Sequence, residues 1–318
     1  MKATFNVTSH KQHLAFAALL LCSLVAFWAS IGNVIRLALQ DERYSHVLLI
    51  LPITVFLFYA KGRATFLNTS FDRTRGLSLV LLGVAVYAAA MLVPDGPAND
   101  VRLSATICAL VIVWMGAFLL CYGPKAFRLA LFPLLFLLLM VPLPDAVVDK
   151  AVIALQHGSA ATTLFLFRLL GVPVLAEGVN LTLPGVQIEV AKECSGIRSS
   201  ESLVIASILA GYFLLQSAWS RLWLVLLTVP ITILKNAVRI TTLSWLAVYV
   251  DPAFLRGNLH RYGGLPFSTI AVALMVFLLY VFRRWETWRR KAVGQRPNAL
   301  LIEKSSTGRA GIREVHNV

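Results

Sequence analysis

Three side chains in this sequence have the chemistry for thiol acyl transfer: Cys194, Arg239 and His260. Cys194 lies in a polar cluster, Glu193 to Ser200, at the start of a long apolar segment in a mostly apolar chain. Arg239 lies late in the next apolar segment, and His260 lies in the loop beyond it. A nearby cation or a helix N-terminus favours the nucleophilic thiolate, and an imidazole can pass a proton to a leaving amine. We therefore predict a cysteine-dependent acyl-transfer site.

The charge stabiliser of this site is predicted to be Arg239. Its guanidinium can hydrogen-bond the oxyanion of a tetrahedral intermediate, where losing one donor commonly costs roughly 3–4 kcal/mol. The backbone N–H groups of Ser195 or Gly196 are a second possible source of oxyanion donors. Asn236 precedes Arg239 by three residues on the same helix face and is expected to orient it.

Each of these residues also has a structural interpretation. An Arg within an apolar segment can be paired with a carboxylate or can extend to the membrane surface. However, burying it costs on the order of 2.5–3.5 kcal/mol, which favours a functional role. His260, taken alone, would be a surface histidine. No single one of these side chains indicates an active site, and the functional hypothesis rests on the presence of all three together.

The composition excludes a soluble globular protein. The chain has 318 residues, of which 58% are hydrophobic and only 14% charged, and its apolar segments follow one another with short connections. We therefore expect an all-α polytopic membrane protein. The net charge of +14 does not indicate nucleic-acid binding, because nine Lys and Arg lie after Phe282 against three Glu. This distribution predicts an integral membrane domain over residues 1–283 and a basic cytoplasmic tail over 284–318.

The cysteines and histidines suggest neither a disulfide framework nor a metal site. Cys22, Cys108 and Cys121 lie in apolar runs, where a cysteine behaves as a small hydrophobic residue. The six histidines are scattered without metal-type spacing. We expect no metal and no organic cofactor.

Apolar segments of about 20 residues predict eight transmembrane helices. The predicted spans are 14–33, 45–61, 76–94, 103–122, 127–144, 198–218, 222–248 and 265–283. The connections rich in Lys and Arg fall on one side when both termini are cytoplasmic. The opposite connections, which hold Cys194 and His260, then face the outside of the membrane. This orientation gathers Cys194, Arg239 and His260 at the outer interface.

The stretch 145–193 precedes the predicted nucleophile. Residues 145–171 are apolar enough for a ninth span, but that assignment would break the charge pattern, so we favour an interfacial helix. Residues 179–190 alternate apolar and polar types around Pro184-Gly185, which predicts a short β-hairpin with a type II turn. Because unpaired strands cannot lie in hydrocarbon, we expect this hairpin at the outer surface.

The sequence resembles the exosortase/archaeosortase family of multispanning membrane transpeptidases over roughly residues 41–283. Residues 194–199, Cys-Ser-Gly-Ile-Arg-Ser, resemble the family's C-S-G-[IL]-R block, and they include Arg198. Asn236-Ala237-Val238-Arg239 resembles its N-x-x-R block, and His260 lies where the family has its histidine. Further similar stretches are Tyr44-Ser45-His46, 140–144, Leu155-Gln156 and 171–174. The Lys192-Glu193 pair departs from the small residue that is commoner before the cysteine.

The resemblance implies cleavage of exported proteins near their C-terminus, at a short motif such as Pro-Glu-Pro before a membrane helix and a basic tail. The cleaved end would pass through a Cys194 thioester to an acceptor amine of unknown identity. The expected partners are such substrate proteins, the acceptor and membrane lipids, with no nucleic acid. The expected location is the inner membrane of a Gram-negative bacterium that produces extracellular polysaccharide, with the active site facing the periplasm.

Two alternatives remain open at this stage. A non-enzymatic polysaccharide-assembly or transport protein would keep Cys194 as a structural or lipidated residue. That function calls for polar residues along a path through the middle of the membrane, whereas these three residues are predicted to gather at one face. A cysteine protease that releases its product to water would share the site and differ only in the acceptor.

Overall fold

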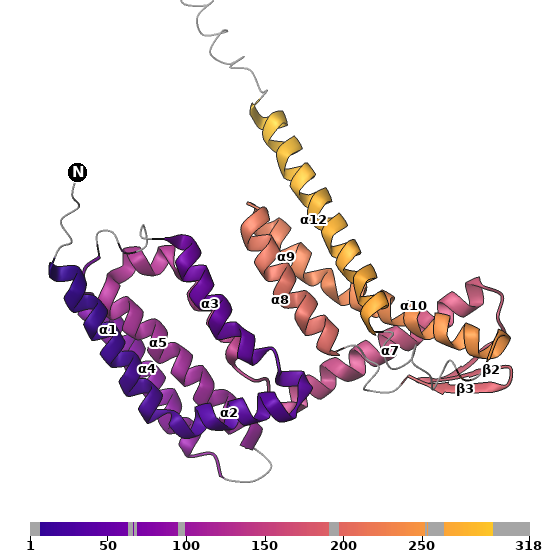
Figure 1. The fold of residues 1–318 in the computed structure, drawn as a ribbon, viewed down its shortest axis with the longest axis horizontal. Helices are drawn as coiled ribbons and strands as arrows, with labels where there is room; N and C mark the ends of the chain where they lie inside the picture. The colour runs from indigo at the N-terminus through magenta and orange to yellow at the C-terminus, as the bar shows by residue number, and fades with distance from the viewer. Residues whose placement is uncertain are drawn as a thin grey trace, which may run out of the picture. The chain divides into compact units, whose positions relative to one another are not determined.

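A computed structural model describes residues 7–62, 66, 69–94, 99–190, 197–251, 253 and 264–294. The chain forms two compact units, Met1–Ala154 and Leu155–Val318, and each is described by itself. Both units are mainly helical, and the second also contains a small sheet (Figure 1). The prediction of a mostly helical protein is therefore confirmed.

Unit 1 contains the helices of the N-terminal half and the beginning of α7. Its elements are α1 (Val7–Ala26), α2 (Trp28–Gln40), the 3-10 turn η1 (Glu42–Tyr44), α3 (Val47–Lys61), α4 (Arg73–Met91), α5 (Asn99–Leu129), α6 (Leu131–Phe136), η3 (Leu137–Met140) and α7 (Asp145–Leu169). A 73° bend separates α1 from α2, and a 90° bend separates the α6–η3 segment from α7. A bent pair of this kind can be a broken span or a re-entrant loop, and the interfacial position expected for residues 145–171 stays a prediction.

Helices α4 and α5 pack most closely within unit 1, and glycines make this possible. A Cβ at Gly76 would lie 2.3 Å from the Leu120 Cα. A Cβ at Gly116 would lie 2.7 Å from the Val80 backbone nitrogen. Small residues at a helix interface let two backbones approach each other, which is the main source of contact between helices in lipid.

A bend interrupts α5 near its C-terminal end, and a cluster of aromatic side chains packs beside this bend. Gly123, at φ 77°, interrupts the helix just before Pro124. The rings of Phe118 and Tyr122 lie 4.8 Å apart and contact further aromatic rings. Cys121 lies fully buried beside them, so the interpretation of this cysteine as a buried hydrophobic residue is confirmed.

In its described residues, unit 2 contains the rest of α7, a three-stranded sheet and four further helices. Its elements are β1 (Leu175–Glu177), β2 (Asn180–Leu183), β3 (Val186–Glu189), α8 (Ile197–Leu214), α9 (Ala218–Leu226), α10 (Thr228–Tyr249) and α12 (Gly264–Gly294). Residues from α8, α9, α10 and α12 form one apolar core that includes Leu203, Leu224, Ile231 and Met275.

The sheet is antiparallel, in the order β1-β2-β3. Gly185 has φ 75°, and Leu183 pairs with Val186 across the turn, so the predicted hairpin is present and is extended by β1. Leu181 and Leu183 are buried in a core that α7 and α10 also form. The apolar face of the hairpin therefore packs against protein.

The helices identify a multi-pass membrane protein, but they do not confirm eight spans. Among the described residues, five helical segments are long and apolar enough to cross a membrane, and the two bent pairs raise the number to seven if each is one span. The apolar segment Ser200–Leu214 corresponds to the sixth predicted span but is shorter. The first predicted span, 14–33, includes the bend between α1 and α2, because apolar residues continue through it.

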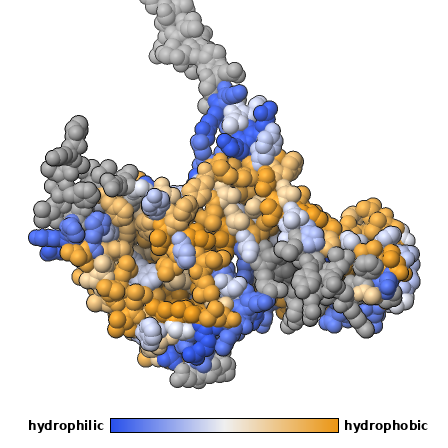
Figure 2. Space-filling model, viewed as in Figure 1, coloured by the Kyte–Doolittle hydropathy of each residue, from blue (hydrophilic) through white to orange (hydrophobic). Residues whose placement is uncertain are grey.

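Large hydrophobic side chains cover the outer faces of these helices, as expected for surfaces that meet lipid (Figure 2). Trp28, Leu39, Tyr59 and Leu92 are more than two-thirds exposed. Hydrophilic residues gather at the lower end of unit 1 and along the C-terminal part of α12 in the view of Figure 2. Helix α12 continues to Gly294, and the division into a membrane domain and a tail at residue 283 stays a prediction.

Candidate active site

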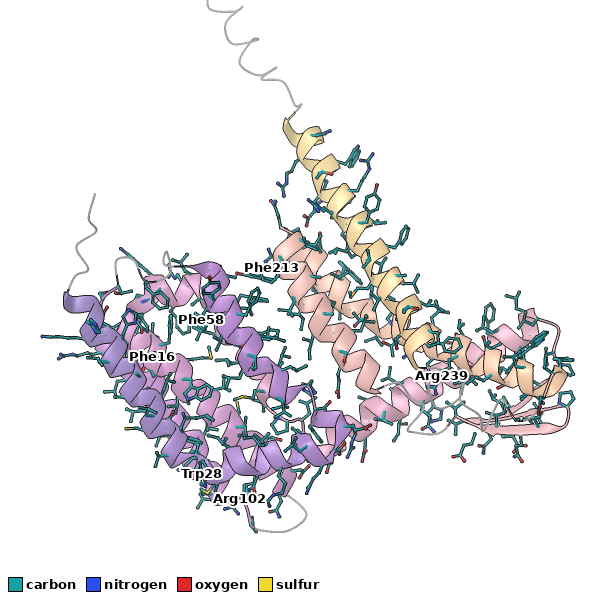
Figure 3. All side chains as sticks on the ribbon, in the orientation of Figure 1. Phe16, Trp28, Phe58, Arg102, Phe213 and Arg239 are labelled. Atoms are coloured by element: carbon teal, nitrogen blue, oxygen red, sulfur yellow. The ribbon has the colours of Figure 1, made fainter. Side chains whose placement is uncertain are left out.

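Of the predicted catalytic residues, Arg239 lies in the described part of the chain, and Cys194 and His260 lie outside it. Arg239 is half-buried on α10 (Figure 3). Ser195 and Gly196 also lie outside the described residues, and Arg198 lies in the first turn of α8, where only its backbone is described.

The described segments that flank the predicted nucleophile and base lie at the same end of unit 2. Helix α8 begins at Ile197, just after Cys194, and α12 begins at Gly264, just after His260. Glu286, late in α12, accepts hydrogen bonds from the backbone N–H groups of Gln216 and Ser217, directly after the end of α8. Residues of α8 and α12 also share one apolar core, so the two helices run side by side in the same direction. Both helices therefore begin at the end opposite Glu286.

The chain that leads to Cys194 is tied to α7 by a buried side chain. The Gln156 Nε2 donates a hydrogen bond to the carbonyl oxygen of Val190 at 2.6 Å. Val190 is 1% exposed and follows the last strand of the sheet. A buried carbonyl without a partner is costly, so this bond fixes where the strand ends.

A second buried hydrogen bond joins α7 to the helix that carries Arg239. The Asn236 Nδ2 lies 3.0 Å from the Ser159 Oγ, and Asn236 is 1% exposed. The two helices approach closely here, because a Cβ at Gly158 would lie 2.9 Å from the Ile233 Cδ1. Arg239 is one helical turn beyond Asn236, so this contact positions the turn of α10 from which the guanidinium extends.

Polar side chains continue along α10 around this contact. Lys235 is 5% exposed and lies four residues before Arg239, which places two positive side chains on neighbouring turns. Asn236 Oδ1, Thr241 Oγ1 and Ser244 Oγ are buried, and no other described residue gives them a hydrogen bond. Buried polar groups inside a membrane helix are expensive and mark functional sites. This stretch of α10 therefore has hydrogen-bonding capacity beyond what its described neighbours use.

Sequence reasoning assigned no role to Gln156 and Ser159. They are three residues apart on α7, and both are buried, at 7% and 0% exposed. Their signal in the sequence is this helical spacing of two polar residues within an apolar segment. What the sequence did not reveal is that one bonds Val190 and the other Asn236, because those partners are 34 and 77 residues away.

Metal chemistry has no candidate site among the residues that the structure describes, since they form no group of three or more His, Cys, Asp and Glu able to hold an ion. The expectation that the reaction needs no cofactor stays a prediction. The described part of the predicted site offers hydrogen-bond donors and positive charge, which suit the stabilisation of an oxyanion.

Comparison with known proteins identifies the class of membrane protein. The family described as transmembrane exosortase (Exosortase_EpsH) matches residues 28–279, most of the chain. The protein belongs to the transmembrane exosortase family. Membership supports a role as a membrane transpeptidase in protein sorting. No curated protein and no solved structure gave a significant match.

Proposed function

We propose that this exosortase cleaves a C-terminal sorting signal of exported proteins through a thioester at Cys194. The thiolate attacks the scissile carbonyl carbon, and Arg239 hydrogen-bonds the oxyanion that forms. His260 donates a proton to the leaving amine as the C–N bond breaks, which leaves the substrate's acyl group on sulfur. An acceptor amine then attacks the thioester and loses its proton to His260, and the thiolate is regenerated.

One observation supports this proposal most strongly: neighbouring residues of α7 form hydrogen bonds to two chain segments that are close in sequence to the predicted catalytic residues. Gln156 bonds the carbonyl of Val190, four residues before Cys194, and Ser159 bonds Asn236, three residues before Arg239. One face of α7 thus supports both the approach to the nucleophile and the helix turn of the charge stabiliser. Rigid support of this kind is what a reaction with strict geometric demands requires.

The substrates in this proposal are proteins that end in a short motif such as Pro-Glu-Pro, a membrane helix and a basic tail. The site faces the periplasm at the outer surface of a bacterial inner membrane. Membrane-impermeant thiol reagents test this orientation in intact cells that carry Gln187→Cys or Gly294→Cys in a background without other cysteines. Labelling of the second site with protection of the first would refute it.

The chemical proposal is tested by co-expressing the enzyme with a candidate substrate from the same genome and adding hydroxylamine. Hydroxylamine attacks thioesters, so the expected result is a shortened substrate that carries a C-terminal hydroxamate. A shortened product without hydroxamate would indicate direct release to water, with no thioester accessible to an amine. No size change for any such substrate would favour the non-enzymatic assembly or transport role.

A further inference from the structure

Helix α2 runs across one end of unit 1, where it follows the 73° bend after α1 (Figure 1). The contacts of α1 show where this bend lies. Near the start of α1, the Nδ1 of His13 lies 2.7 Å from the Tyr122 hydroxyl of α5. At the bend, the rings of Phe27 and Tyr87 lie 4.5 Å apart, and α4 ends four residues after Tyr87, at Met91. Helix α1 therefore extends alongside α5 as far as the end of α4.

The other end of α2 lies at the same level. Tyr44, four residues beyond the end of α2, donates a hydrogen bond to the Asp145 Oδ1 at 3.1 Å. The backbone N–H of Asp145 donates to the Asp100 Oδ2 at 2.8 Å, in the first turn of α5. This turn adjoins the end of α4, because Arg102 donates to the Met91 Sδ at 3.4 Å. Both ends of α2 are therefore held at the level where α4 ends and α5 begins.

This level is a boundary of the membrane. Helices α4 and α5 are both long and apolar enough to cross a membrane, so the chain leaves the hydrocarbon at the end of this pair. Helix α2 has 13 residues, which is about 20 Å, whereas the hydrocarbon core is about 30 Å thick. The second half of a broken span would continue away from this level, and a re-entrant helix would return along α5. The contacts at both ends of α2 fit neither path.

Three groups of side chains divide the surface of α2, and the members of each group recur at helical spacing. The buried group packs on unit 1 and contains Ser30, Val34 and Ala38. The exposed apolar group contains Trp28, Ile35 and Leu39. The exposed polar group contains Asn33, Arg36 and Gln40. A helix with one apolar and one polar side open to its surroundings is suited to the boundary between hydrocarbon and water.

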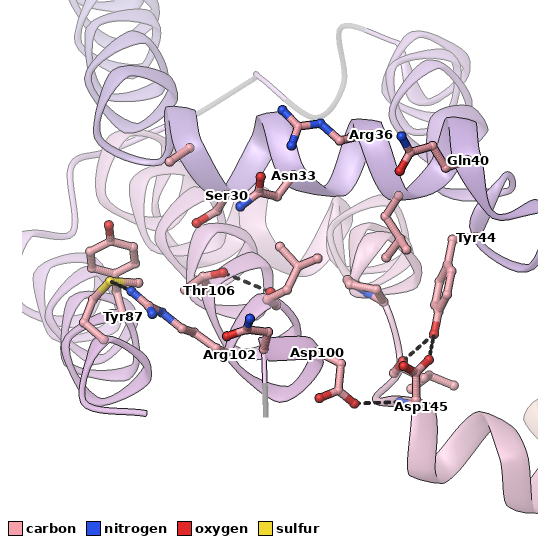
Figure 4. Close-up of a pocket in the computed structure, with 17 residues that line it drawn as sticks. Ser30, Asn33, Arg36, Gln40, Tyr44, Tyr87, Asp100, Arg102, Thr106 and Asp145 are labelled. Carbon is pink, nitrogen blue, oxygen red and sulfur yellow. Dashed lines mark hydrogen bonds between the residues drawn. The ribbon is translucent and has the colours of Figure 1, made fainter. Parts of the chain in front are cut away.

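The exposed polar group borders a recess with a polar lining. It lines a cavity of about 550 Å³ together with polar residues of α5, which are Asn99, Asp100, Arg102 and Thr106 (Figure 4). A polar cavity of this size suits water rather than acyl chains. Figure 4 also shows the guanidinium of Arg36 on the side of α2 opposite Arg102, so that it extends away from α5.

We propose that α2 is an interfacial helix whose partner is the surface of the lipid bilayer. The exposed apolar group contacts the acyl chains just below the headgroups, and the exposed polar group faces water. Arg36 hydrogen-bonds lipid phosphates, whose oxygens match the planar fork of donors in a guanidinium. Because Tyr44 joins the end of α2 to Asp145, this helix also sets the depth at which α7 begins.

The test places spin labels on the full-length protein in lipid bilayers, at single cysteines in a background without other cysteines. Power saturation with O₂, which concentrates in hydrocarbon, and with a water-soluble nickel chelate gives the depth of each label. Between residues 28 and 39 an upright helix would change depth by about 16 Å. We expect labels at Trp28→Cys, Ile35→Cys and Leu39→Cys to lie at one depth, within about 5 Å. Labels at Asn33→Cys and Gln40→Cys should be reached mainly by the nickel chelate.

The matched controls are labels at exposed apolar positions of α4, which are Leu77→Cys, Leu81→Cys and Val84→Cys. Because α4 crosses the membrane, their depth should change steadily along the helix, by up to about 10 Å. Only labelled variants whose thermal unfolding matches that of the parent protein are compared.

A second measurement leaves the parent sequence unlabelled. The fluorescence of Trp28 is taken as the difference between the parent protein and Trp28→Phe, in bilayers whose lipids carry bromine either near the headgroup or near the end of the acyl chain. We expect the shallow bromines to quench this fluorescence more strongly than the deep ones.

Three results would overturn the proposal. The first is a spread of depths along α2 as large as that along α4, which would make α2 part of a span. The second is access of the nickel chelate to the exposed apolar group equal to its access to the exposed polar group, which would place the whole helix in water. The third is stronger quenching of Trp28 by the deep bromines.

Discussion

The side-chain amide of Gln156 donates a hydrogen bond to the carbonyl oxygen of Val190 at 2.6 Å, and both residues are buried. This bond joins the middle of α7 to the end of the three-stranded sheet. Val190 precedes Cys194, the predicted nucleophile, by four residues in the sequence, so we expect a displacement of Val190 to disturb the proposed site.

We expect Gln156→Leu to leave the protein inserted but to lower substrate processing at least about tenfold. The variant leaves the buried carbonyl of Val190 without its donor, which costs about 1–3 kcal/mol, and a misplacement near 1 Å can cost about a hundredfold in rate. Gln187→Leu, at an exposed position of the sheet, is the control for the change of side chain. Normal processing by the Gln156→Leu variant would show that Gln156 does not support the active site.

Arg239→Lys tests whether the guanidinium binds the oxyanion. Lysine keeps the positive charge but not the planar fork of donors, so we expect processing to fall by about a hundredfold with unchanged membrane insertion. The exposed Arg168 on α7 provides the matched control, Arg168→Lys. If Arg239→Lys or Arg239→Ala processed substrate at a near-normal rate, the role of Arg239 would be structural.

Much of unit 2 around the site was predictable from local patterns. Alternating residues around Pro184-Gly185 predicted the hairpin, because a type II turn needs a positive φ at its third residue and Gly185 has one. Strand β1 was not predicted, because Leu175, Ala176 and Glu177 are too few to show alternation. The contact between Asn236 and Ser159 could not be predicted from the sequence either, because only tertiary packing brings the two residues together.

In unit 1 the sequence misplaced the end of the first helix. Apolar residues continue beyond Ala26, so a window of about 20 residues placed a straight span over 14–33. The structure bends by 73° at this point, and the polar residues Asn33, Arg36 and Gln40 then recur on one face of α2. This periodicity gives α2 one polar face, which an average of hydropathy over about 20 residues does not show.

The packing of α4 against α5 gives a prediction about stability. We expect Gly76→Ala to destabilise the protein by about 1–3 kcal/mol, because the added Cβ would lie 2.3 Å from the Leu120 Cα and the backbones must separate. Gly32→Ala is the control, since nothing lies within 4 Å of a Cβ there and alanine favours a helix. Unfolding curves in detergent measure both. Equal stability of the two variants would contradict the close packing of α4 and α5.

Asp41 should make stability depend on pH on the acid side. The hydrogen bonds from the Arg43 side chain, at 2.7 and 2.9 Å to Oδ2, lower the pKa of the Asp41 carboxyl below its ordinary value. A lowered pKa in the folded state adds stability that is fully present above the ordinary carboxyl pKa. That stability is lost as the pH falls through the lowered value.

Thermal unfolding of the parent protein and of Arg43→Gln, measured between about pH 3 and pH 7 across the range of carboxyl titration, tests this dependence. The difference between the two should be largest near neutral pH and should shrink in acid. Arg43 also faces Asp145 and Asp149, each at 4.0 Å, so Asp41→Asn is needed to isolate the contribution of Asp41. Glu177→Gln, at an exposed site, is the control. A difference that did not change with pH would contradict the prediction.

The most direct test of the account is substrate processing by Cys194→Ala in cells that lack related enzymes, with Cys108→Ala as the matched cysteine control. The co-expressed substrate should keep its full length with Cys194→Ala and be shortened normally with Cys108→Ala, while both variants insert in the membrane. Hydroxylamine should yield a hydroxamate product only when Cys194 is present. Continued shortening of the substrate by Cys194→Ala would contradict the thioester mechanism and with it the proposed active site.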